Sequence, residues 1–458
     1  MIKSIKEKLR NANDIQFCLF AGIAAFCTYF SMYAFRKPFG AATYSEIQQI
    51  FGFDFKIFIS ISQLAGYCLS KFIGVKVISE TSYDKRAYMI LLFLGMAFAS
   101  LLGFATVPDQ IKPLFMFING LFLGMIWGLV CGFIEGRQTS DILGAFLCAS
   151  FILASGYVKQ VGKYLMDTWN IPEVWMPFSV GLLFVPLVLL SVFCLTSIPR
   201  PTITDQALKQ KRNPISKSER WNFFGRFAPG LCCLMAIYVL LTIFRTIRDD
   251  FAAEFWQGAS MDGASLFSAS ETPIAFLVTF SMILLYFVRS NSRSFMILNI
   301  MMIAGVSLLG LSGYLYLNAK ISPLQFMIAS GFGVYLAYVP FNYVLFDNLT
   351  ALLGLQFTCG FLITLADALG YTGSVICYFY KNFFASEINW HDFMVQLAIL
   401  TSVIALILLL ISYNYFSRKI DHKVDNSLLE LAEKKTKPKV FSGLNKKTPA
   451  EHCGSCII

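Results

Sequence analysis

The sequence predicts an all-α polytopic membrane protein with twelve transmembrane helices in two six-helix halves. Hydrophobic residues make up 57% of the 458 positions and charged residues only 14%, a balance that excludes an ordinary soluble domain. The apolar residues gather into runs of membrane-spanning length, and the net charge of +10 is concentrated in alternate connections. These three observations carry the prediction.

Each apolar run contains about 20 residues, the length that an α-helix needs to cross the bilayer core. Gly, Pro and Ser inside several runs are tolerated, because neighbouring helices satisfy the backbone groups that these residues free. The runs cover 16–35, 55–78, 88–108, 112–134, 140–162 and 174–197 in the first half, and 229–247, 267–288, 294–317, 324–347, 353–379 and 391–416 in the second.

The positions of the basic residues predict the orientation. Lys and Arg precede the first run and crowd the longest connection and the C-terminal segment, whereas opposite connections hold mainly acids such as Glu46 and Glu254. By the positive-inside rule both termini are cytoplasmic, and we expect the plasma (inner) membrane. The expected organisation is an amphipathic cytoplasmic N-terminus at 1–15, a six-helix half at 16–197, a basic linker at 198–228, a six-helix half at 229–417 and a basic cytoplasmic tail at 418–458. We interpret the basic segments as topological signals and solvated tails, and expect no nucleic-acid partner.

The remaining sequence signals do not call for a cofactor. The start of the chain has no small-residue cleavage site, so we expect no cleaved signal peptide. Most of the twelve cysteines lie inside apolar runs, where cysteine acts as a small apolar residue. Cys453 and Cys456 lie in the polar tail, where modification is open to them, but Ser455 occupies the position that prenylation requires for cysteine. We expect no metal, no cofactor and a monomeric chain.

Charges inside the runs are the candidate functional residues, because an ionisable group at membrane depth costs several kcal/mol unless it pairs or faces water. Lys71 lies near the middle of the second run, so we expect it to face a cavity. Arg36 and Arg245 follow an aromatic residue near the ends of the two opening helices, in YAFRKPF and TIFRTIRDDF. Each arginine is either a helix-end anchor in the headgroups or part of a shared site, and Lys37 is expected to reach the headgroups.

The acidic residues of the second half are candidates for charge pairs or proton carriers. Asp250 and its neighbour Asp249 follow Arg245 closely, so either carboxylate could neutralise Arg245 or Arg248. Asp367 and Glu271 are candidate proton carriers, although we expect Glu271 at the membrane interface. Phenols close to these charges can donate hydrogen bonds to an anion, or belong to the interfacial aromatic belts. They are Tyr29, Tyr33, Tyr67, Tyr338 and Tyr371.

Several motifs resemble the organophosphate:phosphate antiporters of the major facilitator superfamily, which include bacterial glycerol-phosphate and hexose-phosphate carriers. The resemblance is clearest in YFSMYAFRKPF and ISQLAGYCLSKFIGVKV, and continues in FRTIRDDF, YVP and GYTGSV. FIEGR at 133–137 is similar to that family's turn between its fourth and fifth helices. The resemblance implies the major facilitator fold, with substrate bound between the two halves near the midplane.

The resemblance also implies residue roles. Arg36 and Arg245 would grip a phosphate, since the guanidinium fork makes bidentate, charge-assisted bonds. Lys71 and the five tyrosines would support them, Asp250 would be the carboxylate after the second arginine, and helix 1 would continue beyond Pro38. The family has a histidine in its fifth helix, whereas the three histidines here are His391, His422 and His452.

We therefore expect a secondary transporter of a small anion, phosphate or a phosphate ester, working by alternating access and exchange. Because the family's histidine is missing, proton coupling through Asp367 or Glu271, with another organic anion, is an alternative. A second alternative is a transporter-like sensor that signals through its tail. We expect no enzyme, because the sequence shows no nucleophile or zinc motif at membrane depth.

Overall fold

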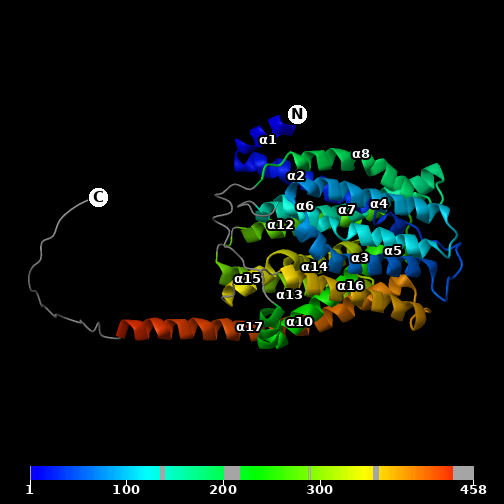
Figure 1. The fold of residues 1–458 in the computed structure, drawn as a ribbon. Coiled ribbons are helices and arrows are strands. Elements are labelled where there is room, and N and C mark those ends of the chain that lie inside the picture. Colours follow the sequence, from blue (N-terminus) through cyan, green and yellow to red (C-terminus); the bar gives the residue numbers. More distant parts are fainter. Residues whose placement is uncertain are drawn as a thin grey trace, which may run out of the picture.

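The computed structural model describes residues 2–134, 140–200, 217–286, 288, 290–353 and 360–436. Long helices run roughly parallel to one another in one elongated bundle (Figure 1). The N-terminus lies near one end of the bundle, and the last helix projects from the same end, which we call the tail end. The opposite end is called the far end.

The first group of helices surrounds α2. This helix packs against α7 and α8, while α3 packs against α5, and α4 packs against α5 and α8. The group comprises α2 (Asp14–Ala34), α3 (Phe55–Glu80), α4 (Arg86–Thr106), α5 (Lys112–Leu123), α6 (Ile126–Ile134), α7 (Ser140–Trp169) and α8 (Met176–Thr196), preceded by the short α1 (Ile2–Arg10).

The second group repeats this arrangement with α10 in the place of α2. Helix α10 packs against α16 and α17, and α13 packs against α14 and α17. The group comprises α10 (Lys217–Asp250), α11 (Ala252–Gly258), α12 (Ser265–Tyr286), α13 (Asn291–Leu317), α14 (Pro323–Tyr343), α15 (Leu345–Leu352), α16 (Gly360–Phe383) and α17 (Trp390–Thr436).

Within the described residues, 11 segments are long and apolar enough to cross a membrane. Helix α7 is not among them, yet its 30 residues give it membrane-spanning length, and it packs between α2 and α12. The sequence prediction of an all-α membrane protein is thus confirmed. Two predicted runs divide in the structure: 112–134 into α5 and α6, and 324–347 into α14 and α15.

Local sequence signals set several helix starts. The Asn13 side chain accepts the backbone N–H of Gln16 at 2.8 Å, and Asp54 accepts that of Ile57 at 3.1 Å. Ser322 and Gln325 form a reciprocal capping box at the start of α14. These side chains satisfy amides that the first turn of a helix leaves without partners.

The end of α2 corrects one expectation. The resemblance implied a helix continuing beyond Pro38, but α2 ends at Ala34 and a 3-10 helix, η1 (Pro38–Ala41), follows it. Proline has no N–H and so cannot continue the i→i−4 hydrogen bonds of α2, and the chain tightens into i→i+3 bonds here, such as that from the Gly40 N–H to the Lys37 carbonyl at 3.0 Å. Gly40 lets η1 approach the end of α10: an added Cβ would lie 3.3 Å from the Asp250 carbonyl oxygen.

The two groups meet mainly through α7 against α12 and α3 against α16. Part of the predicted basic linker and most of the predicted tail lie outside the described residues, as do Cys453, Cys456 and the last three residues of FIEGR.

Candidate functional site

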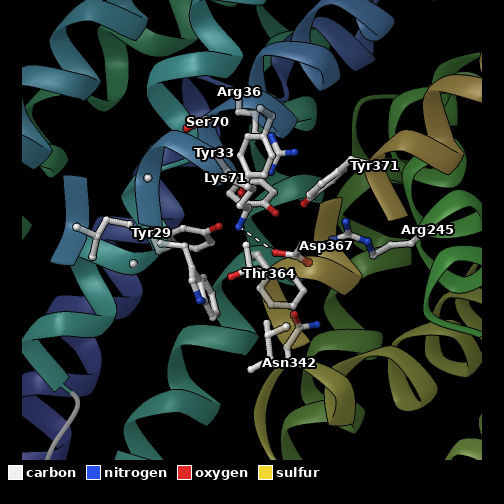
Figure 2. Close-up of a pocket in the computed structure, with 18 of the residues that line it drawn as sticks. Tyr29, Tyr33, Arg36, Ser70, Lys71, Arg245, Asn342, Thr364, Asp367 and Tyr371 are labelled. Carbon is white, nitrogen blue, oxygen red and sulfur yellow. Dashed lines mark ion pairs between the residues drawn. The ribbon is translucent and has the colours of Figure 1, made fainter. Parts of the chain in front are cut away.

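A cavity of about 500 Å³ lies between the two groups of helices. Its wall is built from both groups, with α2, α3, α6 and α7 on one side and α10, α14 and α16 on the other (Figure 2). The lining includes Tyr29, Tyr33, Arg36, Tyr67, Ser70, Lys71, Trp127, Phe151, Arg245, Tyr338, Asn342, Ile363, Thr364, Asp367 and Tyr371.

The two predicted arginines both line this cavity. The guanidinium carbon of Arg36 lies 4.0 Å from the centre of the Tyr67 ring, and that of Arg245 lies 4.5 Å from the centre of the Tyr338 ring. The buried Nε atoms of both have no hydrogen-bond partner, and neither guanidinium forms an ion pair within the part of the chain that the structure describes. Aromatic faces stabilise a cation but do not cancel its charge. Among the described residues, the cavity therefore holds two guanidiniums that form no ion pair.

The third predicted cation is paired. Lys71 Nζ lies 3.0 Å from Asp367 Oδ2, an ion pair that joins α3 to α16 across the cavity (Figure 2). The other carboxylate oxygen of Asp367 accepts a hydrogen bond from the Tyr238 hydroxyl, which lies 2.8 Å from the Tyr338 hydroxyl. One polar chain thus connects three helices of the second group to the first.

All five predicted tyrosines lie at the cavity, and all are at most 4% exposed. The rings of Tyr67 and Tyr371, one from each group, meet edge to face at 5.0 Å. Tyr29 meets Trp127 at 5.0 Å in the same manner. These tyrosines therefore do not belong to an interfacial belt.

Sequence reasoning missed part of the wall. Trp127 and Phe151 form an aromatic patch on the tail-end side of the arginines, and Tyr238 supports Asp367 from outside the lining. Trp127 and Phe151 sit in uninterrupted apolar runs, so nothing local distinguishes them from lipid-facing residues. Tyr238 did carry a signal, since it precedes Arg245 by seven residues and so lies near the same face of α10.

A second set of charges lies toward the far end, and we call it the far-end cluster: Lys37, Lys159, Arg248, Asp249, Asp250 and Glu271. Lys37 Nζ lies 2.7 Å from Asp249 Oδ2 and also pairs with Asp250. Lys159 pairs with Asp249, and the Tyr378 hydroxyl donates to Asp250 at 2.8 Å. Lys37 and Lys159 come from the first group and the carboxylates from the second, so the cluster joins the groups.

This cluster overturns three expectations. Asp250 and Asp249 were candidates to neutralise Arg245 or Arg248. They pair instead with lysines of the other group, because the last turn of α10 packs against η1 and lies within reach of Lys159 on α7. Lys37 was expected in the headgroups and is only 4% exposed.

The third expectation concerned Glu271, which was expected at the interface. Glu271 is 6% exposed and lies 2.7 Å from Arg248, whose Nη2 also donates to the Met327 carbonyl at 2.8 Å. Burying Arg248 among helices of one group makes an internal counter-ion necessary, and Glu271 supplies it.

Further ion pairs lie beyond the cluster. Lys56 of α3 pairs with Glu254 of α11 at 2.6 Å, again linking the two groups. Burial raises the pKa of Glu254 to about 7, against the opposing effect of Lys56. The described residues contain no group of three or more His, Cys, Asp or Glu side chains that could hold a metal ion.

Comparison with known proteins agrees with this geometry at the level of the fold. The profile of a family described as "Family of unknown function (DUF5690)" matches residues 38–419. No curated protein matches the sequence. The chain has the major facilitator fold, confirming that prediction, while specific likeness to organophosphate carriers has no support from these comparisons.

Three solved structures illustrate the likeness. A D-xylose-proton symporter is 14% identical with a TM-score of 0.57, over 88% of this chain and 98% of that one. A bacterial homologue of the human lysosomal transporter Spinster, inward-facing and unoccupied, is 12% identical with a TM-score of 0.60, over 89% and 98%. A POT family transporter in complex with a thioalcohol-conjugated peptide is 11% identical with a TM-score of 0.58, over 88% and 96%.

Proposed function

The chain belongs to the DUF5690 family of unknown function, and we propose that it is a secondary active transporter of a small anion, phosphate or a phosphate ester. The anion binds in the central cavity and crosses the membrane by alternating access between the two groups of helices. The major facilitator fold, which transporters of sugars and peptides also use, supports this proposal.

The observation that carries the proposal is the pair of arginines that form no ion pair with any residue that the structure describes. Arg36 and Arg245 come from corresponding helices of the two groups and line one cavity. A buried guanidinium without a partner is unfavourable, so a ligand that supplies oxygen acceptors and negative charge is favoured there. A phosphate dianion supplies both, because its oxygens accept bidentate bonds from two forks and single bonds from the surrounding phenols.

The shape of the cavity supports an alternating-access cycle. Its wall continues toward the tail end through Ile78, Asn342 and Ile363, whereas the far-end cluster lies on the opposite side of the arginines. If the tail end is cytoplasmic, as the positive-inside rule predicts, the cavity extends toward the inside and the far-end cluster lies between it and the outside. Outward opening then requires the pairs of Lys37, Lys159 and Lys56 with the second group to separate.

A direct test is binding and uptake by purified protein in reconstituted vesicles. We expect inorganic phosphate and glycerol 3-phosphate to bind and to be taken up, and a monocarboxylate to bind more weakly because it carries less charge. Arg36→Lys should weaken both activities, and the matched control Arg226→Lys, on the exposed tail-end part of α10, should not. Wild-type protein that binds no anion would refute the proposal.

The sensor alternative is separated by the same assay. A protein lacking residues 437–458 should still accumulate phosphate if the chain is a transporter. A sensor would bind phosphate but would never move it, with or without those residues.

A further inference from the structure

We propose that Asp367 is a proton-binding site whose occupancy depends on the bound anion, so that this carrier moves its anion together with a proton. The inference rests on the function proposed above, because it names the coupling ion of the same cavity. It replaces the exchange expected from the sequence with anion–proton symport.

The starting point is Lys71, whose ammonium group can be attracted either by Asp367 or by an anion in the cavity. Its ammonium group pairs with Asp367 at 3.0 Å in the empty cavity, and it lines the same cavity as Arg36 and Arg245 (Figure 2). The side chains of Lys71 and Asp367 are 14% and 10% exposed, so solvent provides little alternative compensation. An anion between the two arginines adds a second negative charge within the reach of one ammonium group.

Anion binding changes the set of groups that compensate the negative charge of Asp367. When the anion draws Lys71 toward itself, the hydrogen bond from Tyr238 to Oδ1 is what Asp367 keeps among its contacts to described residues. A buried carboxylate that loses its only cation is strongly disfavoured in its charged form. A proton added to Oδ2 removes that charge, so the anion and the proton bind cooperatively. The step makes and breaks no other bond, and the proton leaves again when the anion departs and Lys71 returns.

Other groups around Asp367 do not remove the need for the proton. Those that face it or share its cavity are Tyr67, Cys68 and Lys71 from α3, Tyr238 and Arg245 from α10, Tyr338 and Asn342 from α14, Tyr371 from α16, and Arg36. The phenols, the thiol and the amide are neutral, and both arginines are occupied by the anion itself. In the part of the chain that the structure describes, Lys71 is the one ion-pair partner of Asp367.

The test measures protons and inorganic phosphate together in vesicles whose membrane potential is clamped. For coupling to one proton, an inward gradient of one pH unit should raise phosphate accumulation about tenfold. Phosphate itself titrates near neutral pH, so every measurement is compared with Asp367→Asn, for which the probe's own protons are the same. The wild type should take up as much as one proton more per bound phosphate than Asp367→Asn does, and its extra response to the gradient should be absent in that variant.

Two further variants guard against a misfolded Asp367→Asn. Lys71→Met leaves Asp367 without a cation before any anion arrives, so its carboxyl group should already be protonated and the proton uptake on phosphate binding should disappear. Asp84→Asn is the matched control, because Asp84 pairs with Arg200 on the exposed surface and is not among the described residues that line the cavity. This control should keep the proton uptake of the wild type.

The results distinguish the two levels of the proposal. Equal proton uptake in the wild type, Lys71→Met and Asp367→Asn would overturn proton coupling and leave an exchanger. Failure of the wild type to bind inorganic phosphate, glycerol 3-phosphate or any other anion tested would overturn the proposed function itself.

Discussion

Arg36 and Lys37 are adjacent in sequence but enter two regions with different charge balance. The central cavity holds three cations, Arg36, Lys71 and Arg245, against the single carboxylate of Asp367 among the described lining residues. The far-end cluster holds three cations and three carboxylates, joined into ion pairs. A balanced buried cluster is suited to holding helices together, whereas a cavity with excess positive charge is suited to an anion. Because both regions hold three cations, it is the number of carboxylates that separates the two roles.

The largest expected effect follows from unbalancing the far-end cluster. Asp249→Ala removes the carboxylate between Lys37 and Lys159, leaving Lys159 without a described ion-pair partner. Breaking a buried pair from one side costs about 3–5 kcal/mol, so we expect the state closed at the far end to lose most of its population. Spin labels at Gln48→Cys and Gln257→Cys, on the two sides of the far end, should report a longer distance. An unchanged distance between the two labels in correctly inserted protein would show that the far-end cluster does not hold this end closed.

The second effect separates neighbouring residues. Arg36→Lys should lose a bidentate bond of about 1.5–3 kcal/mol, roughly ten- to a hundredfold in phosphate affinity measured by equilibrium binding. The losses of phosphate affinity caused by Arg36→Lys and Arg245→Lys should be strongly non-additive, because losing either arginine already breaks the coordination of the anion from both sides.

Lys37→Gln tests the other side of this comparison. It should shift the far-end distance while changing intrinsic phosphate affinity less than Arg36→Lys does, since Lys37 points to Asp249 and Asp250. Near-normal phosphate binding by Arg36→Lys would contradict the proposal that the two arginines together bind the phosphate, and the substrate would then be undetermined.

A smaller effect is expected for Lys71→Ala. Lys71 is already paired with Asp367, so part of its attraction for an anion is cancelled in the empty cavity. Affinity should fall by about tenfold or less, and more for dianions than for monoanions, because the lost attraction scales with ligand charge. A series of phosphate, sulfate and monocarboxylate measures this. Equal losses for all three anions would show that Lys71 does not contact the ligand.

The smallest effect is a pH dependence at the far end. The pKa of Glu254 is raised from 4.5 to about 7 by burial, so the closed state binds a proton there more tightly than a state in which Glu254 is hydrated. By linkage, lowering the pH from 7 toward 5 favours the closed state, and raising it through 7 removes that contribution, although protonation weakens the pair with Lys56. The distance between the two spin labels should follow this trend, and Glu254→Gln should flatten it.

The sequence by itself determined the membrane fold and the identity of the residues that line the cavity's charged part. Spans of about 20 apolar residues have one stable solution in a bilayer, so the helices could be predicted from composition alone. Lys71 was conspicuous because an ionisable group at membrane depth is costly. The same argument left Arg36, Arg245 and the five tyrosines between the interface and a shared site, and the resemblance implied the shared site.

Only the tertiary structure decided how the charges pair. Asp249 and Asp250 are four and five residues from Arg245, yet their partners, Lys37 and Lys159, are more than 80 residues away along the chain. Lys71 and Asp367 likewise come from different groups of helices. Coulomb attraction depends on distance in space, and the packing of η1 against α10, of α7 against α12 and of α3 against α16 sets those distances. Sequence spacing reports only neighbours on one helix, so it found the charges but assigned Asp250 to the wrong partner.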